Sequence, residues 1–330
     1  MRRREFITVL GGAAASSAAW PLAARAQQPA TPVVGSLAVT SHEGQEATTA
    51  AFREGLNRAG YVDGRNLVID YREADNRLDK LPELAADLVS RGATVIFAWG
   101  GAAAARAAKA TTARIPIVFV IGQDPIAMGI VPSFSRPGGN ITGVTFMAAE
   151  LSPKRLGLLN ELVPGAARYA LLVDPNAPQT SSIISESRAA AASIGRPIEV
   201  FGASNSREID ATFKDLVRKG ADALVVGSSS LFTTRRVQLV TLAAIHRLPA
   251  IYYDRASVEL GGLMSYGARI AEAMRQGGIY VGRILKGEKP SDLPVVQAVK
   301  FEFILNLQTA RALNLAVPAS LLAQADEVIE

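Results

Sequence analysis

Short apolar runs alternate with amphipathic stretches over most of this chain, and that alternation limits the folds open to it. The apolar runs are separated by segments such as Thr48–Ala59, in which Phe52 and Leu56 share one helical face. Strand–helix alternation of this kind predicts parallel sheets covered by helices. The expected strands are Val33–Val39, Leu67–Tyr71, Thr94–Ala98, Ile117–Ile121, Ile141–Phe146, Tyr169–Val173, Ile198–Phe201, Ala223–Val226 and Ala250–Tyr253.

An internal repeat indicates two such α/β lobes in series. The segment DLVSRGATVIFA (Asp87–Ala98) resembles DLVRKGADALVV (Asp215–Val226), and in each a helical pattern ends at a glycine before an apolar strand. A glycine at a helix end is a common local solution, so convergence explains part of the match. The units that follow correspond as well, with IPI before one strand and LPA before the other.

The repeat and the segments around it suggest where the chain divides. We expect a signal peptide over 1–26, a first lobe over 27–148, a second lobe over 149–255, a return to the first lobe over 256–286, and a C-terminal crossing and closing segment over 287–330. The stretch GGLMSYG (261–267) lies within the expected return. Its glycines can absorb backbone rotation between the lobes.

The first 26 residues have the pattern of a secretory signal. Three arginines precede a weakly apolar Gly/Ala/Ser stretch, and Ala24-Arg25-Ala26 offers a small-x-small cleavage site. The order RREFI fits the twin-arginine type. The alternative is an uncleaved membrane anchor, but the stretch is short and poorly hydrophobic for a stable span. We expect cleavage after Ala26 and a soluble periplasmic product.

Charge and cysteine content narrow the function classes. The chain has 35 Lys+Arg and 30 Asp+Glu, a net charge of +5, and residues 1–26 contain four Arg and one Glu. The remaining 31 basic and 29 acidic residues give the mature chain a net charge of +2, so we expect no nucleic-acid partner. No cysteine is present, which excludes disulfides, a thiolate nucleophile and a Cys-based metal site.

Small and polar residues follow the expected strands, where ligands bind in open parallel sheets. Gly100 and Gly101 precede an Ala-rich helix, whose bare N–H groups and dipole would suit the acidic end of a ligand. Asp124 or Asp254 would meet a basic end. The candidate ligand-binding residues are Ser41, His42, Trp99, Gly100, Gly101, Asp124, Asn176, Ser228, Ser229, Ser230, Asp254 and Tyr266.

Each of these candidates also has a purely structural interpretation. The glycine pair would serve equally well as a tight turn, and either aspartate could make an Asx turn or a surface ion pair. Helix capping explains one serine of the three but not all of them, which favours a ligand role for the run. Trp99, the single tryptophan left after signal removal, could wall a cleft or fill the core.

Motifs of known catalytic sites are missing from the sequence. It contains no GxSxG, no HExxH, no clustered metal ligands and no nucleotide-binding glycine loop. The mature chain has two histidines, His42 in a candidate cleft loop and His246 at an expected helix end. We expect no catalysis, no metal and no cofactor. A secreted hydrolase of small esters or amides that uses His42 is a remote alternative.

A resemblance to a known family covers nearly all of the mature chain. It is carried by IPIVFVIGQDPIAMGIVPSFSRPGGNITGVT, LSPKRLGLLNELVP, ADALVVGSSSLF, LPAIYYDRASVELGGLMSYG and the chain from YVGRILKGEKP to the C-terminus. These stretches resemble the periplasmic substrate-binding proteins of ABC importers in the group associated with tryptophan and tyrosine uptake. The resemblance implies the type I periplasmic-binding architecture, with two Rossmann-like lobes, parallel sheets and a ligand cleft between the lobes.

The resemblance also implies a function and partners. It predicts a monomeric receptor that closes by a hinge on a small molecule, such as an amino acid, an aromatic one among the candidates, or a related carboxylate. It also predicts delivery to an ABC permease with its cytoplasmic ATPase. The chain departs from the pattern at SHEGQ and at WGGAAAA, where alanine replaces a hydroxyl residue. A ligand-sensing partner of a sensor kinase is the alternative function.

Overall fold

Strand pairing arranges the chain in two sheets in the computed structural model. The structure describes residues 31–41, 45–297 and 300–330. The expected signal peptide, its cleavage site and His42 therefore lie outside the described residues. Residues Pro32–Glu330 form one compact unit that contains both sheets.

The first sheet is parallel throughout. Its order is β11-β5-β4-β3-β1-β2, and its central strands VIFAW and IVFVI are buried along their whole length. Continuous apolar strands are typical of a parallel sheet that is covered on both faces. The strands are β1 (Val33–Ala38), β2 (Val68–Glu73), β3 (Val95–Trp99), β4 (Ile117–Ile121), β5 (Ile141–Thr145) and β11 (Val296–Gln297).

The second sheet has the order β13-β12-β10-β9-β8-β6-β7. Among the described pairs, only β10 with β12 is antiparallel. The expected α/β fold with two lobes built on parallel sheets is thus confirmed. The strands are β6 (Tyr169–Val173), β7 (Ile198–Gly202), β8 (Ala223–Val226), β9 (Ala250–Tyr252), β10 (Met264–Ala268), β12 (Phe301–Asn306) and β13 (Glu327–Ile329).

Helices cover both faces of each sheet. On the first sheet, α2 (Leu81–Ser90) and α3 (Ala102–Thr111) pack on one face, while α1 (Glu46–Arg58) and α10 (Ile270–Leu285) pack on the other. The second sheet lies between one layer that contains α4, α5, α11 and α12 and another that contains α6, α7 and α8. The bounds of the helices in these two layers are α4 (Ser152–Leu162), α5 (Thr180–Ser193), α6 (Ser206–Arg218), α7 (Ser230–Thr234), α8 (Arg236–Ile245), α11 (Leu307–Ala312) and α12 (Ala319–Gln324). The short helix α9 spans Arg255–Glu259.

Glycine ends the two repeated helices in the way the repeat predicts. Gly92 follows α2 with φ 76° and Gly220 follows α6 with φ 71°. Both values lie in the left-handed region, which a residue without a Cβ adopts most readily. The two copies of the repeat therefore share their helix ends as well as their strands. Short 3₁₀ helices occur at Leu78–Lys80, Ala148–Leu151 and Pro290–Asp292.

The return to the first sheet begins later than the sequence predicts. Residues 256–286 were expected to return as one piece, but Met264–Ala268 pairs with β9 and β12 in the second sheet. The stretch GGLMSYG therefore ends inside that sheet, and α10 is the first element to lie against the first sheet again. The C-terminal segment divides as well, because β11 pairs with β5 while β12 pairs with β10.

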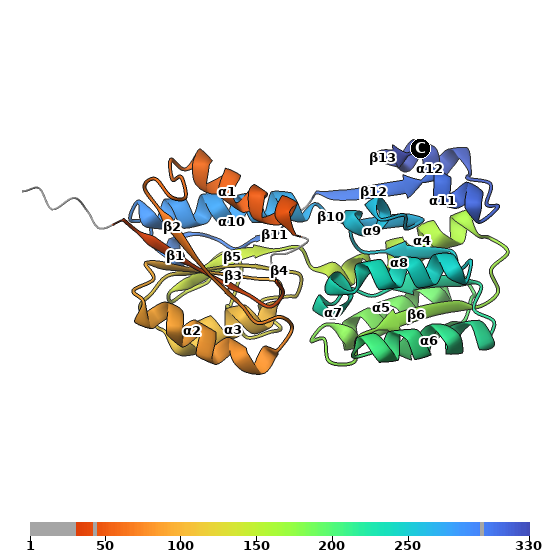
Figure 1. Cartoon of the computed structure of the whole chain (residues 1–330), viewed down its shortest axis with the longest axis horizontal. Helices are drawn as coiled ribbons and strands as arrows, with labels where there is room; N and C mark the ends of the chain where they lie inside the picture. Colours follow the sequence, from red (N-terminus) through yellow and green to blue (C-terminus); the bar gives the residue numbers. More distant parts are fainter. Residues whose placement is uncertain (1–30, 42–44, 298–299) are drawn as a thin grey trace, which may run out of the picture. The chain divides into compact units, whose positions relative to one another are not determined.

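Helix α10 lies directly against α1, as Figure 1 shows. Their contact is made backbone to backbone, because a Cβ added to Gly278 would stand 2.3 Å from the Phe52 carbonyl oxygen. A Cβ on Gly55 would stand 2.0 Å from the Arg275 carbonyl oxygen. Two helices from opposite ends of the chain are therefore fixed together by glycine.

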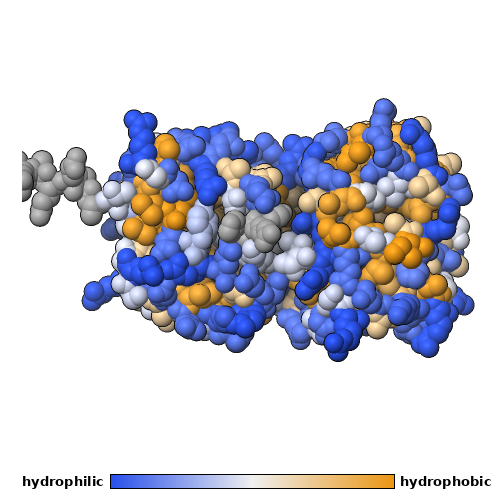
Figure 2. Space-filling view, viewed as in Figure 1, coloured by the Kyte–Doolittle hydropathy of each residue, from blue (hydrophilic) through white to orange (hydrophobic). Residues whose placement is uncertain are grey.

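On the face shown in Figure 2, apolar side chains gather in several patches between hydrophilic areas. The most exposed large apolar residues are Val237 (63%) and Ile245 (67%) on α8. Within the described ranges, no helix is both long enough and apolar enough to cross a membrane.

Candidate functional site

Loops from both sheets line a cavity of about 730 Å³. From the first sheet come the segments that follow β1, β3 and β4, and from the second come those that follow β8 and β9. These are carboxyl ends of parallel strands, where open α/β sheets place their ligands. The volume lies within the range of small-molecule sites.

The first sheet contributes the N-terminus of α3. Gly100 (φ 83°) and Gly101 (φ 156°) precede the helix, and both line the cavity. No side chain of the helix's own N-cap residue closes this end, but the N–H of Ala102 donates to Gln123 Oε1 (3.0 Å). The N–H of Ala104 donates to the carbonyl of Gly101 (3.2 Å), so the N–H of Ala103 is left without an acceptor among the described residues. This helix end therefore keeps one backbone hydrogen-bond donor.

Trp99 serves the core and the cavity together. The residue is only 3% exposed and packs with Phe52 and Phe97 in the apolar layer beneath α1 and α10. Its indole N–H donates to Ser36 Oγ (3.0 Å), so its polar atom is used inside the fold. Trp99 also lines the cavity, so this packed residue lies at the border between the core and the site.

The three consecutive serines make three different contacts. Ser229 caps α7, because its Oγ accepts from the N–H of Phe232 (3.1 Å). Ser230 Oγ donates to the carbonyl of Gly100 (3.1 Å) and so joins the two sheets' loops. Ser228 is 8% exposed, and its Oγ has no hydrogen-bond partner among the described residues. Since buried hydroxyls normally have a partner, Ser228 is the serine that is open to a ligand.

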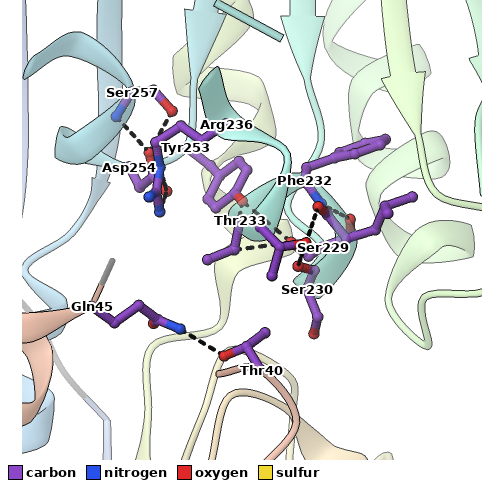
Figure 3. A network of polar contacts seen from close by, with 12 residues as sticks. Thr40, Gln45, Ser229, Ser230, Phe232, Thr233, Arg236, Tyr253, Asp254 and Ser257 are labelled. Atoms are coloured by element: carbon purple, nitrogen blue, oxygen red, sulfur yellow. Dashed lines mark hydrogen bonds and ion pairs between the residues drawn. The ribbon is translucent and has the colours of Figure 1, made fainter. Parts of the chain in front are cut away.

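Asp254 and Arg236 form a buried ion pair in the wall from the second sheet. Asp254 Oδ2 accepts from Nε (3.2 Å) and Nη2 (2.8 Å) of Arg236, and Oδ1 accepts from the N–H (3.0 Å) and the hydroxyl (2.6 Å) of Ser257. Figure 3 shows the Arg236 side chain beside Asp254, with Tyr253 close by. Burial lowers the pKa of Arg236, but attraction to Asp254 outweighs it and raises the pKa above its usual value.

Tyr253 and Thr233 extend this wall toward the serines. The two hydroxyls lie 2.8 Å apart, and Tyr253 donates to the carbonyl of Ser229 (3.2 Å). Burial raises the pKa of the Tyr253 phenol, and the negative charge of Asp254 adds to the effect. The phenol therefore stays protonated at neutral pH. In Figure 3, Gln45 and Thr40 lie on the other side of the cavity from Thr233 and Ser230.

Two glutamine amides connect the walls. Gln123 Nε2 donates to Gln179 Oε1 (2.8 Å), and Gln179 Nε2 donates to the carbonyl of Ser228 (2.7 Å). Since Gln123 also caps α3, a continuous chain of hydrogen bonds runs from that helix to the serine loop. The amides fix the distance between the two loops on this side of the cavity.

Seven of the expected site residues line the cavity, and four described ones do not. Whether any of them contacts a ligand stays a prediction. The lining residues are Trp99, Gly100, Gly101, Ser228, Ser229, Ser230 and Asp254, and those elsewhere are Ser41, Asp124, Asn176 and Tyr266. Asp254 lines the cavity, but its carboxylate already accepts four hydrogen bonds, which argues against the expected role as partner of a basic group.

The four residues outside the cavity have local contacts instead. Asp124 makes the Asx turn that was its alternative interpretation, with Oδ1 accepting from the N–H of Ile126 (2.8 Å). The Asn176 N–H donates to Asp174 (3.0 Å), and the Ser41 carbonyl accepts from Gln45 Nε2 (2.9 Å). Tyr266 packs its ring in the core layer that contains α4 and α5.

Several cavity residues have no prediction from the sequence. Arg155 on α4 is 1% exposed, its Nε donates to the Tyr266 carbonyl (2.7 Å), and burial lowers its pKa to about 10. An arginine in the apolar face formed by Leu156, Leu159 and Leu162 was a usable signal. The other residues without a prediction are Gln45, Phe146, Gln179, Thr233 and Arg236.

Two arginines of the cavity lining, Arg255 and Arg269, form ion pairs. Arg255 pairs with Glu259 (2.6 Å) and with Glu327 (2.7 Å), and Arg269 pairs with Asp326 (3.2 Å). The Arg255–Glu327 pair joins α9 to β13, and the Arg269–Asp326 pair joins the residue after β10 to the residue before β13. No group of acidic and histidine residues suited to a metal ion occurs in the described part of the chain.

Comparisons with known proteins match almost the whole described chain. A family model described as ABC transporter substrate binding protein matches residues 33–329. The chain is 26% identical over 283 residues to a tyrosine-binding protein of Clostridioides difficile (strain R20291), covering 86% of this chain and 81% of that one.

Solved structures show the same fold. An ABC domain from Streptococcus pneumonia in complex with L-Trp superposes with a TM-score of 0.82 at 25% identity, covering 91% of this chain and all of the other. A ligand-free, open substrate-binding protein with adhesive properties from Clostridium difficile superposes with a TM-score of 0.65 at 25% identity, covering 90% and 99% of the two chains.

Proposed function

The chain belongs to the family of ABC transporter substrate-binding proteins, and we propose that it captures an amino acid or a related small carboxylate for an ABC importer. Aromatic amino acids are the first candidates. The observation that carries the proposal is the cavity of about 730 Å³, which is lined from both sheets and contains a buried serine hydroxyl with no partner among the described residues. The names of the tyrosine-binding and L-Trp-bound relatives support this ligand class.

The lining of the cavity suits an aromatic ligand. Trp99, Phe146 and Tyr253 give it apolar surface, and hydroxyl and amide groups at Thr40, Gln45, Thr233 and Gln179 give it hydrogen-bonding positions. An apolar site with a few directed polar groups is the usual form of a small-molecule site. Aromatic stacking adds roughly 0.5–1.5 kcal/mol beyond the area that is buried.

The proposed mechanism is closure of the two lobes around the ligand. The chain passes between the sheets three times, after β5, after β10 and between β11 and β12. A ligand that contacts loops of both sheets would add to the Ser230–Gly100 and Gln123–Gln179 bonds and favour the closed arrangement. The closed form would be the one that a permease with its ATPase recognises, outside the cytoplasmic membrane.

Ligand titration tests the proposal. The protein (residues 27–330) is unfolded, refolded to remove any bound ligand, and titrated with the twenty amino acids while Tm and the emission of Trp99 are followed. Ligand at 100 times its Kd stabilises the fold by about 2.7 kcal/mol, which raises Tm by several degrees. Saturable stabilisation by aromatic amino acids is expected. No response to any amino acid or small carboxylate would overturn the proposed ligand class.

Ser228→Ala tests the assignment of the site. Losing one hydrogen bond to the ligand should weaken binding roughly two- to tenfold, with the fold intact. Ser187→Ala is the matched control, because Ser187 is also buried and its Oγ has no partner in the described part of the chain, but it lies on α5 outside the cavity lining. Equal affinities of the two variants for the ligand would remove Ser228 from the site.

A further inference from the structure

We infer that Arg236 is the anchor for the ligand's carboxylate, and that the receptor recognises this group and not an ammonium. The inference rests on the proposed function and specifies which part of the ligand the protein reads. It follows from the hydrogen bonds that the buried part of the cavity already makes, and from those that it leaves open.

The acceptors in the buried wall are occupied. A carboxylate has about four acceptor positions, and Asp254 uses four on Arg236 and Ser257. Asp254 is 5% exposed, so solvent does not supply further donors easily. The remaining acidic residues of the lining belong to α1, α9, α10 and β12. Of these, Glu259 on α9 adds to the raised pKa of Arg236, and its carboxylate is paired with Arg255 (2.6 Å).

The amide and carbonyl oxygens beside the serines are used as well. Gln123 Oε1 accepts from the N–H of Ala102, and Gln179 Oε1 accepts from Gln123. The carbonyls of Ser228 and Gly100 accept from Gln179 and Ser230. Beside the serines, the oxygens of Asp254, Gln123 and Gln179 therefore already accept hydrogen bonds from the protein, and a ligand ammonium would have to share them.

Several hydrogen-bond donors of the cavity lining, in contrast, have no acceptor among the described residues. A guanidinium has five N–H donors, and Arg236 uses its Nε–H and one N–H of Nη2 on Asp254. The other three have no acceptor among the described residues, although the side chain is only 14% exposed and lines the cavity. The hydroxyl of Ser228 is a further buried donor without a partner in the same lining.

A surface rich in donors fits a group rich in acceptors. The planar fork of a guanidinium matches a carboxylate in two parallel hydrogen bonds, which are among the strongest in proteins. The ion pair with Asp254 holds the guanidinium of Arg236 in place, so the side chain loses little conformational freedom when an anion binds. The ligand class is therefore a small carboxylate whose amino group is dispensable.

Ligand analogues separate the two ends of the molecule. The probes are L-tryptophan, indole-3-propionate, indole-3-propionamide and tryptamine, with L-tyrosine, 3-(4-hydroxyphenyl)propionate and tyramine as a second series, all measured by calorimetry. The free carboxylates should bind within about tenfold of the amino acids, and the amide and the amines should bind roughly 10- to 100-fold more weakly.

Each outcome has a distinct meaning. Binding of the amino acids and amines without the carboxylates would overturn this inference and leave the proposed function standing. Failure of every probe would overturn the aromatic ligand class and this inference together. Binding of carboxylates alone would support both the receptor role and the role of Arg236.

Variants of Arg236 supply a second readout. Arg236→Gln should abolish the preference for indole-3-propionate over its amide, and Arg236→Lys, which keeps the charge but not the fork, should reduce it. Arg235→Gln is the matched control, since it removes one arginine from the adjacent, exposed position outside the lining. The preference is the ratio of the affinities of one variant for the acid and for the amide, so it does not depend on the stability of that variant. An unchanged preference in folded Arg236→Lys and Arg236→Gln would overturn the inference.

Discussion

Neighbouring residues of one type do different work here, because each occupies a different place on the backbone. Ser229 is at the N-cap of α7, Ser230 is one residue further along and reaches Gly100, and Ser228 points its hydroxyl at no described partner. The same holds for Arg235 and Arg236, of which only the second lines the cavity. The role of a side chain here therefore changes from one position in the sequence to the next.

The Ser229 cap gives a prediction for stability. Ser229→Ala removes the acceptor for the N–H of Phe232 and should lower the free energy of unfolding by about 0.5–2 kcal/mol. Chemical unfolding with urea measures the change. Ser228→Ala, at the preceding position, should leave stability within about 0.5 kcal/mol of the original protein. A larger loss at Ser228 than at Ser229 would contradict the division of roles.

Asp174 gives a prediction for pH dependence. Burial raises its pKa, and the N–H of Asn176 and the hydroxyl of Ser229 offset this only in part. The folded protein thus holds the proton more tightly, so the stabilisation from protonation is present below the unfolded-state pKa and is lost as pH rises through the folded-state pKa. Asp174→Asn should be more stable than the original protein at pH 7, with the gain shrinking toward pH 4.

The control for Asp174 is Glu208, whose pKa is shifted in the opposite direction. Hydrogen bonds from the hydroxyl and the N–H of Ser204 lower the pKa of Glu208. Its contribution to stability is therefore present above its unfolded-state pKa and is lost as pH falls through the folded-state pKa. Glu208→Gln should be less stable at pH 7 and equal at low pH. Urea unfolding between pH 3.5 and 7 measures the free energy of unfolding of both variants. If this free energy changed with pH in the same direction in the two variants, both assignments would be contradicted.

At the scale of elements, the contact of α1 with α10 controls how the first sheet is covered. Glycine inside a helix usually weakens it, by roughly 0.5–1 kcal/mol relative to alanine. Glycine is needed at Gly55 and Gly278 despite this cost, because the helices approach so closely that a Cβ would meet a carbonyl oxygen. The contact fixes the middle of α10, the helix that follows the passage out of the second sheet.

This packing predicts opposite effects for the same substitution in two helices. Gly278→Ala should destabilise the protein by about 1–3 kcal/mol, because the new methyl group forces the helices apart. Gly157→Ala on α4, where nothing lies within 4 Å of the added Cβ, should stabilise by about 0.5–1 kcal/mol. Urea midpoints at unchanged m-values measure both. Stabilisation by Gly278→Ala would show that the helices can separate at no cost.

Strand and helix identity could be predicted from the sequence, because buried parallel strands leave long apolar runs and helices end at glycines such as Gly92. The placement of β10 could not, since its pairing with β12 depends on a strand more than thirty residues later. Arg236 could not be separated from Arg235, because α7 ends just before them and the helical phase is interrupted. For Asp124 the sequence allowed both a ligand contact and an Asx turn, and the structure has the turn to Ile126.

At the scale of the whole molecule, neither lobe is made from one continuous piece of chain. The first sheet needs α10 and β11 from the C-terminal third, and the second sheet needs β10, β12 and β13. Residues 27–148 alone would leave Phe97 and Val120 without the covering glycine of α10. The lobes therefore depend on each other although their cores are separate.

Truncation tests this dependence. A fragment of residues 27–255 lacks α10 and four strands, and it should show no cooperative thermal transition, while binding the dye ANS as partly folded chains do. The protein of residues 27–330 is the control and should unfold cooperatively. A sharp transition in the fragment would show that the first lobe is stable without α10. Adding residues 256–330 as a separate chain should restore part of the transition.

The late position of α10 also determines the order in which the molecule can be built. A ribosome completes domains from the N-terminus, and a continuous domain can fold while the rest is still being made. Here the helix that covers the first sheet ends at Leu285, and the strand that closes the second sheet ends at Ile329. Nearly the entire message must be translated before either lobe can assume its final form, so the completion of both lobes waits for the last part of the chain.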